Sequence, residues 1–149
     1  MSNQIQNLDE YSQWRADNYE KTCLVKFGSE ACPPCQKLKP LIEAIADKQK
    51  GTIAVASIDS TKSPDLRKHF MVKKIPLCVV FPKSKKIMEM KKKVEADVTS
   101  EDKNKEKSEE NETFLQSRIV KKELLNPDGV RLIGYKPDDL IETLKNCSI

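Results

Sequence analysis

Apolar and polar residues alternate along the chain in a pattern that predicts helices and strands in turn. Short apolar runs rich in β-branched residues predict four buried strands, and apolar residues spaced three or four apart predict helices between them. The predicted strands are 22–27, 52–58, 76–81 and 130–133. The predicted helices begin at Leu8, at Pro34, at Ser63 and at Pro137. Helices that alternate with strands, ending in a hairpin, predict a three-layer α/β domain around a mixed sheet.

Local signals indicate where several helices start and bend. Asp9 and Glu10 lie in the first turn of the first helix, where the helix dipole favours acids. Ser63 can cap the third helix, with Pro64 at its first position. Pro40 lies inside the second helix and should kink it, because proline cannot donate the helical hydrogen bond.

The pattern breaks between about residues 83 and 117. A lysine-rich block at 83–93 precedes an acid-rich stretch, and 97–112 holds one apolar residue, Val98. Such a stretch cannot offset its ordering entropy by burial. We therefore expect one domain over 1–149 with an insertion in its last hairpin connection, disordered at its centre. The flanks, 87–94 and 114–125, could extend the hairpin or form helices, and we interpret the lysine block as a solvated loop.

Composition excludes several classes of function. The net charge of +4 is small for 149 residues, and both signs of charge occur throughout, which argues against a nucleic-acid partner. No apolar stretch approaches the roughly 20 residues of a membrane helix, and no secretory signal opens the sequence. We expect a cytoplasmic monomer without a membrane or nucleic-acid partner.

Five cysteines, at 23, 32, 35, 78 and 147, are an odd number, which argues against a secreted disulfide scaffold. In a reducing compartment a close pair is more often catalytic or metal-binding. Cys23 and Cys78 lie in apolar strands and should be buried, whereas Cys147 should be an inert exposed thiol. His69, the only histidine, should lie at the surface rather than pair with a cysteine.

Cys32-Pro33-Pro34-Cys35 is the segment with the clearest chemistry. A CxxC pair brings two sulfurs within disulfide reach across one turn, and the small ring makes the bond easier to open than a structural disulfide. A helix N-terminus after the first cysteine stabilises a thiolate, the form that attacks disulfides. We predict that Cys32 is the exposed nucleophile and Cys35 the more buried resolving thiol.

The two prolines change the start of this helix. Neither Pro33 nor Pro34 has an N–H, and Pro34 biases Pro33 away from helical geometry. The helix should therefore begin at Pro34, and the N–H of Cys35 should be the donor nearest to Cys32. A CxxC can also be half of a zinc site, but a four-cysteine site needs a second close pair, and the other three cysteines are isolated in sequence.

Three segments resemble those of thioredoxins. The segment 24–40 resembles their active-site segment, with Pro40 at the position of the kinking proline of the catalytic helix. Ile75-Pro76 before an apolar strand resembles their cis-proline loop, and Leu132-Ile133-Gly134 resembles their closing strand and glycine. The resemblance covers about residues 7–82 and 126–146. It implies a thioredoxin-like α/β fold with a mixed four- or five-stranded sheet flanked by helices.

The resemblance also implies an activity: disulfide exchange with disulfide-bearing protein substrates through a mixed disulfide, mainly as a reductant. No cofactor is implied beyond the Cys32–Cys35 disulfide itself, and electrons would come from thioredoxin reductase or glutathione. A cis Ile75–Pro76 bond would lie beside the cysteines, where a substrate could pair as a short extra strand. The implied substrate-binding residues are Pro33, Pro34, Ile75, Pro76 and Gly134.

The sequence departs from the family pattern around the cysteine pair. Pro-Pro replaces the usual Gly-Pro, Ala31 replaces the common tryptophan, and Gly28 replaces an aromatic residue. Lys26 stands where the family has a buried carboxylate. Strand alternation puts it on the side of Leu24, which under the resemblance is close to Cys35. We therefore expect Lys26 to modulate the thiol pKa, the alternative being that its stem carries the charge to water or to Glu30.

Two other functions stay open from the sequence. The fold could serve as a binding module in which the insertion recruits a partner. Alternatively, Cys32 and Cys35 of two chains could hold a metal ion or an iron–sulfur cluster.

Overall fold

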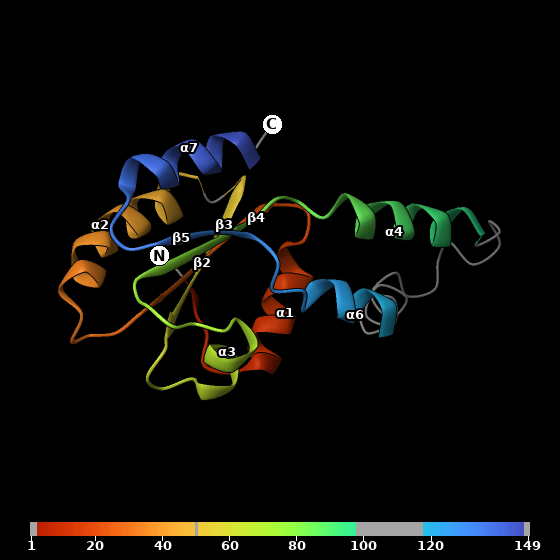
Figure 1. The fold of residues 1–149 in the computed structure, drawn as a ribbon. Coiled ribbons are helices and arrows are strands. Elements are labelled where there is room, and N and C mark those ends of the chain that lie inside the picture. Colours follow the sequence, from red (N-terminus) through yellow and green to blue (C-terminus); the bar gives the residue numbers. More distant parts are fainter. Residues whose placement is uncertain (1–2, 50, 98–117, 148–149) are drawn as a thin grey trace.

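Five strands form one open mixed sheet in the order β1-β3-β2-β4-β5 (Figure 1). The computed structural model describes residues 3–49, 51–97 and 118–147. β1 and β2 run parallel to β3, whereas β4 runs antiparallel to both β2 and β5, so the predicted mixed sheet is confirmed. The strands are β1 (Asn3–Gln4), β2 (Thr22–Gly28), β3 (Ile53–Asp59), β4 (Leu77–Phe81) and β5 (Val130–Ile133).

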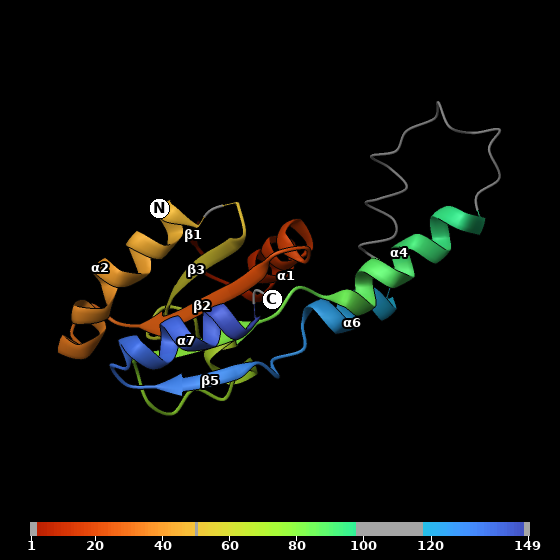
Figure 2. The same ribbon diagram turned by 90° about the horizontal axis from the view of Figure 1, so that it is seen from above.

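Helices cover both faces of the sheet (Figure 1). α2 and α7 pack on one face, and α1 and α3 pack on the other. α4 and α6 lie beside each other and project from the sheet (Figures 1 and 2). The described ranges contain no helix with the length and apolar character needed to cross a membrane. The helices are α1 (Leu8–Asn18), α2 (Pro33–Lys48), α3 (Pro64–His69), α4 (Lys85–Asp97), α6 (Arg118–Leu124) and α7 (Pro137–Cys147).

β2 is the central strand, and all seven of its residues are buried. Its alternate side chains enter two separate cores. Cys23, Val25 and Phe27 pack toward α1 and α3. Leu24 packs toward α2 and α7, together with Cys78 of β4. Cys23 and Cys78 are both buried, as predicted.

The capping predictions were partly correct. Ser63 is the cap residue of α3, but its side chain makes no capping hydrogen bond. One oxygen of Asp65 instead accepts from Leu66 N at 2.8 Å, and the other accepts from Leu8 N at 2.8 Å. Asp65 therefore links the start of α3 to the start of α1. Pro40 lies inside α2, as predicted.

The described parts of both flanks of the predicted insertion form helices, α4 and α6, rather than extending the hairpin. The lysine-rich block is correspondingly helical from Lys85 onward, not a solvated loop. Ser84 anchors this segment, because its N–H donates to Tyr19 O at 2.8 Å. The core between α1, α4 and α6 contains Ala16, Tyr19, Ile87, Val120 and Leu124. The centre of the predicted insertion, 98–112, lies outside the described residues, and the assignment of 1–149 to one domain stays a prediction.

Replacing Ile87 with alanine should destabilise the protein, because Ile87 is fully buried between α1, α4 and α6. Truncation of a buried isoleucine costs about 2–5 kcal/mol. Urea unfolding of Ile87→Ala measures the loss. The matched control is Glu89→Ala, since Glu89 is exposed on the same helix and its loss should change stability by less than about 0.5 kcal/mol. Equal stabilities of the two variants would show that α4 is not docked as described.

Candidate active site

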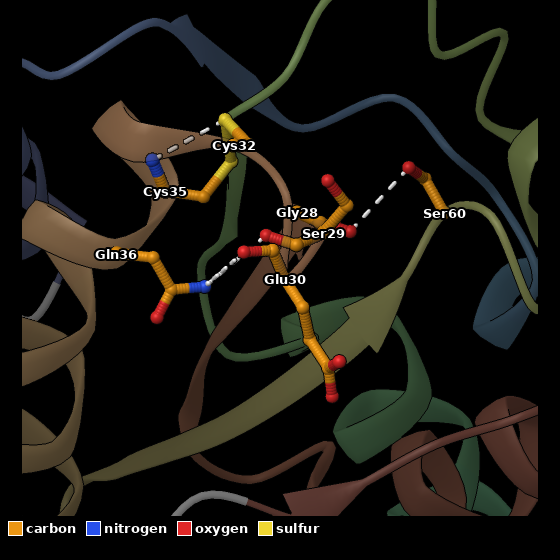
Figure 3. Close-up of a disulfide and its surroundings, with 7 residues drawn as sticks. All are labelled: Gly28, Ser29, Glu30, Cys32, Cys35, Gln36 and Ser60. Carbon is orange, nitrogen blue, oxygen red and sulfur yellow. Dashed lines mark hydrogen bonds between the residues drawn. A yellow bond between two sulfur atoms is a disulfide. The ribbon is translucent and has the colours of Figure 1, made fainter.

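Cys32 and Cys35 form a disulfide where β2 passes into α2 (Figure 3). Their Cα atoms lie 5.2 Å apart, within the range that a disulfide spans. Cys32 is half-buried, whereas Cys35 is 1% exposed. The pair therefore has an accessible outer sulfur and an enclosed inner sulfur, which is the difference in burial that the sequence predicts.

Cys32 is the cap residue of α2. Its Sγ accepts a hydrogen bond from Cys35 N at 3.3 Å, so the predicted donor is correct. The helix begins at Pro33 and not at Pro34, so that prediction was wrong by one residue. The first N–H groups of a helix have no partner within the helix, so two prolines in the first turn remove no hydrogen bond.

The loop before Cys32 is held on both sides (Figure 3). Gln36 Nε2 of α2 donates to Ser29 O at 3.2 Å and to Glu30 O at 3.4 Å. Ser60, just after β3, donates from its N–H to Gly28 O at 3.0 Å. Sequence reasoning missed Gln36 and Ser60, because a glutamine in a helix and a serine in a turn are ordinary residues there. Together these hydrogen bonds join the loop before Cys32 to α2 and to the segment after β3.

Gly28 allows β2 to pass close beneath the disulfide. A Cβ at this position would lie 3.3 Å from both Cβ and Sγ of Cys35 and 3.4 Å from Lys26 Cε. A side chain at residue 28 would therefore press on both the inner cysteine and the lysine. Cys35 and Lys26 border the same small space, which places Lys26 near Cys35 as the sequence predicts.

Lys26 is buried, with 9% of its surface exposed. Burial lowers the pKa of Lys26, and a smaller opposing influence comes from Cys78, its partner in the β2–β4 register. Burial raises the pKa of Cys78 to about 12. Lys26 borders a cleft of about 140 Å³ together with Glu30, and among the described residues no ion pair joins these two side chains.

Pro76 and Gly134 meet at the same end of the sheet as the cysteines. The Ile75–Pro76 peptide bond is cis, and Leu77 lies opposite Phe27 of β2. Gly134, with φ of +90°, donates its N–H to Pro76 O at 2.8 Å. Of the remaining predicted binding residues, Ile75 is half-buried, and Pro33 and Pro34 are exposed.

Two exposed apolar side chains flank Gly134, and sequence reasoning missed both. Ile133 is 47% exposed and Tyr135 is 48% exposed. The C-terminal end of β5 lies at the same end of the sheet as the start of α2 (Figures 1 and 2). Their position next to the glycine of the closing strand was the signal that could have revealed them. Tyr135 is an exposed aromatic side chain next to Gly134, whereas Ala31, next to Cys32, is not aromatic.

The prediction for Cys147 was wrong, and the prediction for His69 was partly correct. Cys147 is half-buried rather than exposed, and burial raises its pKa. The main-chain carbonyl of Cys147 accepts from Thr22 Oγ1 at 3.3 Å, which brings the end of α7 onto β2. His69 is also half-buried, because its ring Nε2 contacts Leu125 O in the segment after α6.

The candidate cysteines do not belong to a metal cluster in the described part of the chain. Within 3–49, 51–97 and 118–147, no group of three or more histidine, cysteine, aspartate or glutamate residues is placed to hold a metal ion. Function without a cofactor stays a prediction.

Comparison with known proteins decides the family. The family model named Thioredoxin matches residues 4–104. The chain belongs to the thioredoxin family. The resemblance seen in the sequence is therefore confirmed, and so is the thioredoxin-like fold. The X-ray structure of a thioredoxin from Fasciola hepatica superposes over 97% of both chains with a TM-score of 0.63 at 14% identity, a level that speaks for the fold alone.

Curated thioredoxin relatives match only part of this chain. The chloroplastic thioredoxin Y2 of Arabidopsis thaliana is 32% identical over 68 residues, which is 46% of this chain and 41% of the relative. Human thioredoxin domain-containing protein 8 is 29% identical over 83 residues, which is 56% of this chain and 65% of the relative. The match thus spans less than two thirds of either relative.

Gly134→Ala should destabilise this thioredoxin-family chain by about 1–2 kcal/mol, because an alanine is strained at a φ of +90°. The added Cβ meets nothing within 4 Å, so the loss would come from the backbone alone. Gly51→Ala is the control, since it also meets nothing within 4 Å and has no positive φ. Urea unfolding compares the two, and equal stabilities would contradict the described backbone at Gly134.

Proposed function

We propose that this chain catalyses thiol–disulfide exchange with protein substrates through Cys32 and Cys35. One observation carries the proposal: the two sulfurs form a disulfide at the start of α2, with the outer one accessible and the inner one enclosed. Membership of the thioredoxin family supports the same activity. A substrate chain would bind at the end of the sheet where the cysteines, Pro76 and Gly134 lie.

The reaction proceeds in two exchanges. In the reduced protein the Cys32 thiolate attacks a substrate disulfide, forms a mixed disulfide and releases one substrate sulfur as a thiolate that takes up a proton. The Cys35 thiolate, whose proton has passed to solvent, then attacks Cys32 Sγ and releases the second substrate thiolate, which takes up a proton. Two electrons pass to the substrate, and the Cys32–Cys35 disulfide forms. The Cys35 N–H and the N-terminus of α2 stabilise the attacking thiolate.

The substrate chain would bind beside the exposed prolines of the cysteine loop. Because Gly134 already donates to the carbonyl of Pro76, the main chain of Ile75 is the part of this loop offered to an extended substrate. Ile133 and Tyr135 would contact side chains of the substrate. Pro33 and Pro34 would face it next to the outer sulfur.

The direction of exchange belongs to the same proposal. We expect net reduction of substrates, with thioredoxin reductase or glutathione as the electron source, because thioredoxin has a potential of about −270 mV, at the reducing end of this fold's range. The proposal also includes a cytoplasmic monomer of one domain that works without a cofactor and without a nucleic-acid or membrane partner.

Serine substitutions test the two roles. Cys32→Ser should abolish reduction of insulin by dithiothreitol, because the attacking sulfur is lost. Cys35→Ser should accumulate a mixed disulfide through Cys32, detected by mass spectrometry, because the resolving sulfur is lost. Cys147→Ser is the control and should retain wild-type turnover, since this thiol is free in the structure.

Two results would count against these roles. Release of substrate by Cys35→Ser at the wild-type rate would refute the assignment of Cys35. Failure of the wild-type protein to reduce insulin or to form a mixed disulfide would favour the alternative of a binding module.

Tyr135→Ala should weaken binding of protein substrates, because the exposed ring is lost next to Gly134. We expect KM for insulin to rise about fivefold, close to 1 kcal/mol, with little change for a small disulfide reagent. Val130→Ala is the control, since Val130 is exposed at the other end of β5. Equal KM values for the two variants would remove Tyr135 from the docking surface.

A further inference from the structure

A buried lysine and the inner cysteine border the same small space next to Gly28. Lys26 Cε and Cys35 Sγ are 3.4 and 3.3 Å from one point, the position that a Cβ on Gly28 would occupy. Lys26 is enclosed by strands on both sides, with Ser57 of β3 and Cys78 of β4 as its register partners. Lys26 therefore lies in the central strand of the sheet.

Within the described ranges, no ion pair involves the ammonium group of Lys26. Cys78 is neutral, since burial raises its pKa to about 12. On α2, Glu43 favours the charged form of Lys26, whereas Lys39 opposes it. The ionisable residues that border the cleft with Lys26 are Glu30, Lys39, Glu43 and Asp59.

Opening of the disulfide supplies a new anion at this place. While the bond is intact, Cys35 carries no charge. When two electrons enter from a donor thiolate, the S–S bond breaks and Cys35 can leave as a thiolate beside Lys26. An opposite charge within about 4–6 Å lowers the pKa of an acid by about one to three units.

We propose that Lys26 is a positioning residue whose ammonium becomes the counterion of the Cys35 thiolate in the reduced protein. The inference rests on the proposed thiol–disulfide exchange and specifies how its second step begins. The thiolate held by Lys26 attacks Cys32 Sγ of the mixed disulfide without first giving its proton to a base. The substrate sulfur leaves as a thiolate and takes a proton from water, so charge and electrons balance.

The proposal predicts in which direction Lys26 shifts the equilibrium between the disulfide and the dithiol. A cation that stabilises the Cys35 thiolate stabilises the dithiol form, and the Cys32–Cys35 disulfide becomes a stronger oxidant. Loss of the cation should therefore raise the pKa of Cys35 and shift the equilibrium toward the disulfide.

Three substitutions separate charge from packing. Lys26→Met removes the charge and keeps a long apolar stem, Lys26→Arg keeps the charge, and Lys39→Met removes an exposed lysine of the same cleft. Thiolate absorbance near 240 nm, titrated in the Cys32→Ser background, gives the pKa of Cys35, with the protein lacking both cysteines as baseline. Equilibration of the otherwise wild-type variants with glutathione gives the redox constant.

We expect Lys26→Met to raise the pKa of Cys35 by about one unit or more. The equilibrium with glutathione should shift about tenfold toward the disulfide, which corresponds to a potential about 30 mV more negative. Lys26→Arg should restore both values, and Lys39→Met should leave both near wild type. Circular dichroism and urea unfolding establish that each variant is folded.

Superimposable titrations for wild type and Lys26→Met, with an unchanged glutathione equilibrium, would overturn the proposal. A folded Lys26→Arg that behaves as Lys26→Met would also overturn it, because charge would then not be the cause. In both cases insulin reduction by the wild type would leave the proposed function standing. Absence of that reduction would instead refute the proposed function itself.

Discussion

The site depends on the rigid passage from β2 into α2. β2 is buried along its whole length and pairs with β3 on one side and β4 on the other, so its end has little freedom. Gln36 and Ser60 hold the loop that follows it, and the Cys32 sulfur caps the helix. A disulfide mounted in this way stays at one orientation toward a partner, which is what an exchange between two proteins requires.

Two departures from the family pattern, Gly28 and Lys26, lie close to each other and to Cys35. A residue larger than glycine at position 28 would press on both Cys35 and Lys26. Gly28 leaves open the space that Cys35 Sγ and Lys26 Cε both border. The fold therefore retains the thioredoxin arrangement, whereas a lysine stands where the resemblance implies a buried carboxylate.

The sequence predicts the elements that are determined by residues close together in the chain. The apolar run of β2 and the capping position of Cys32 follow from local pattern and helix physics. β1 was missed because its two residues are polar and pair with β3 only through the backbone. The helical state of 85–97 was left open because Ile87 becomes a core residue only when it meets Ala16 and Tyr19, far away in sequence.

The redox equilibrium of the wild-type pair with glutathione tests the central claim most directly. Trapping of free thiols followed by mass spectrometry reports each cysteine at every ratio of reduced to oxidised glutathione. We predict that Cys32 and Cys35 convert together as one two-electron couple, while Cys23 and Cys78 stay reduced. Independent modification of Cys32 and Cys35, or no disulfide between them at any ratio, would contradict the account.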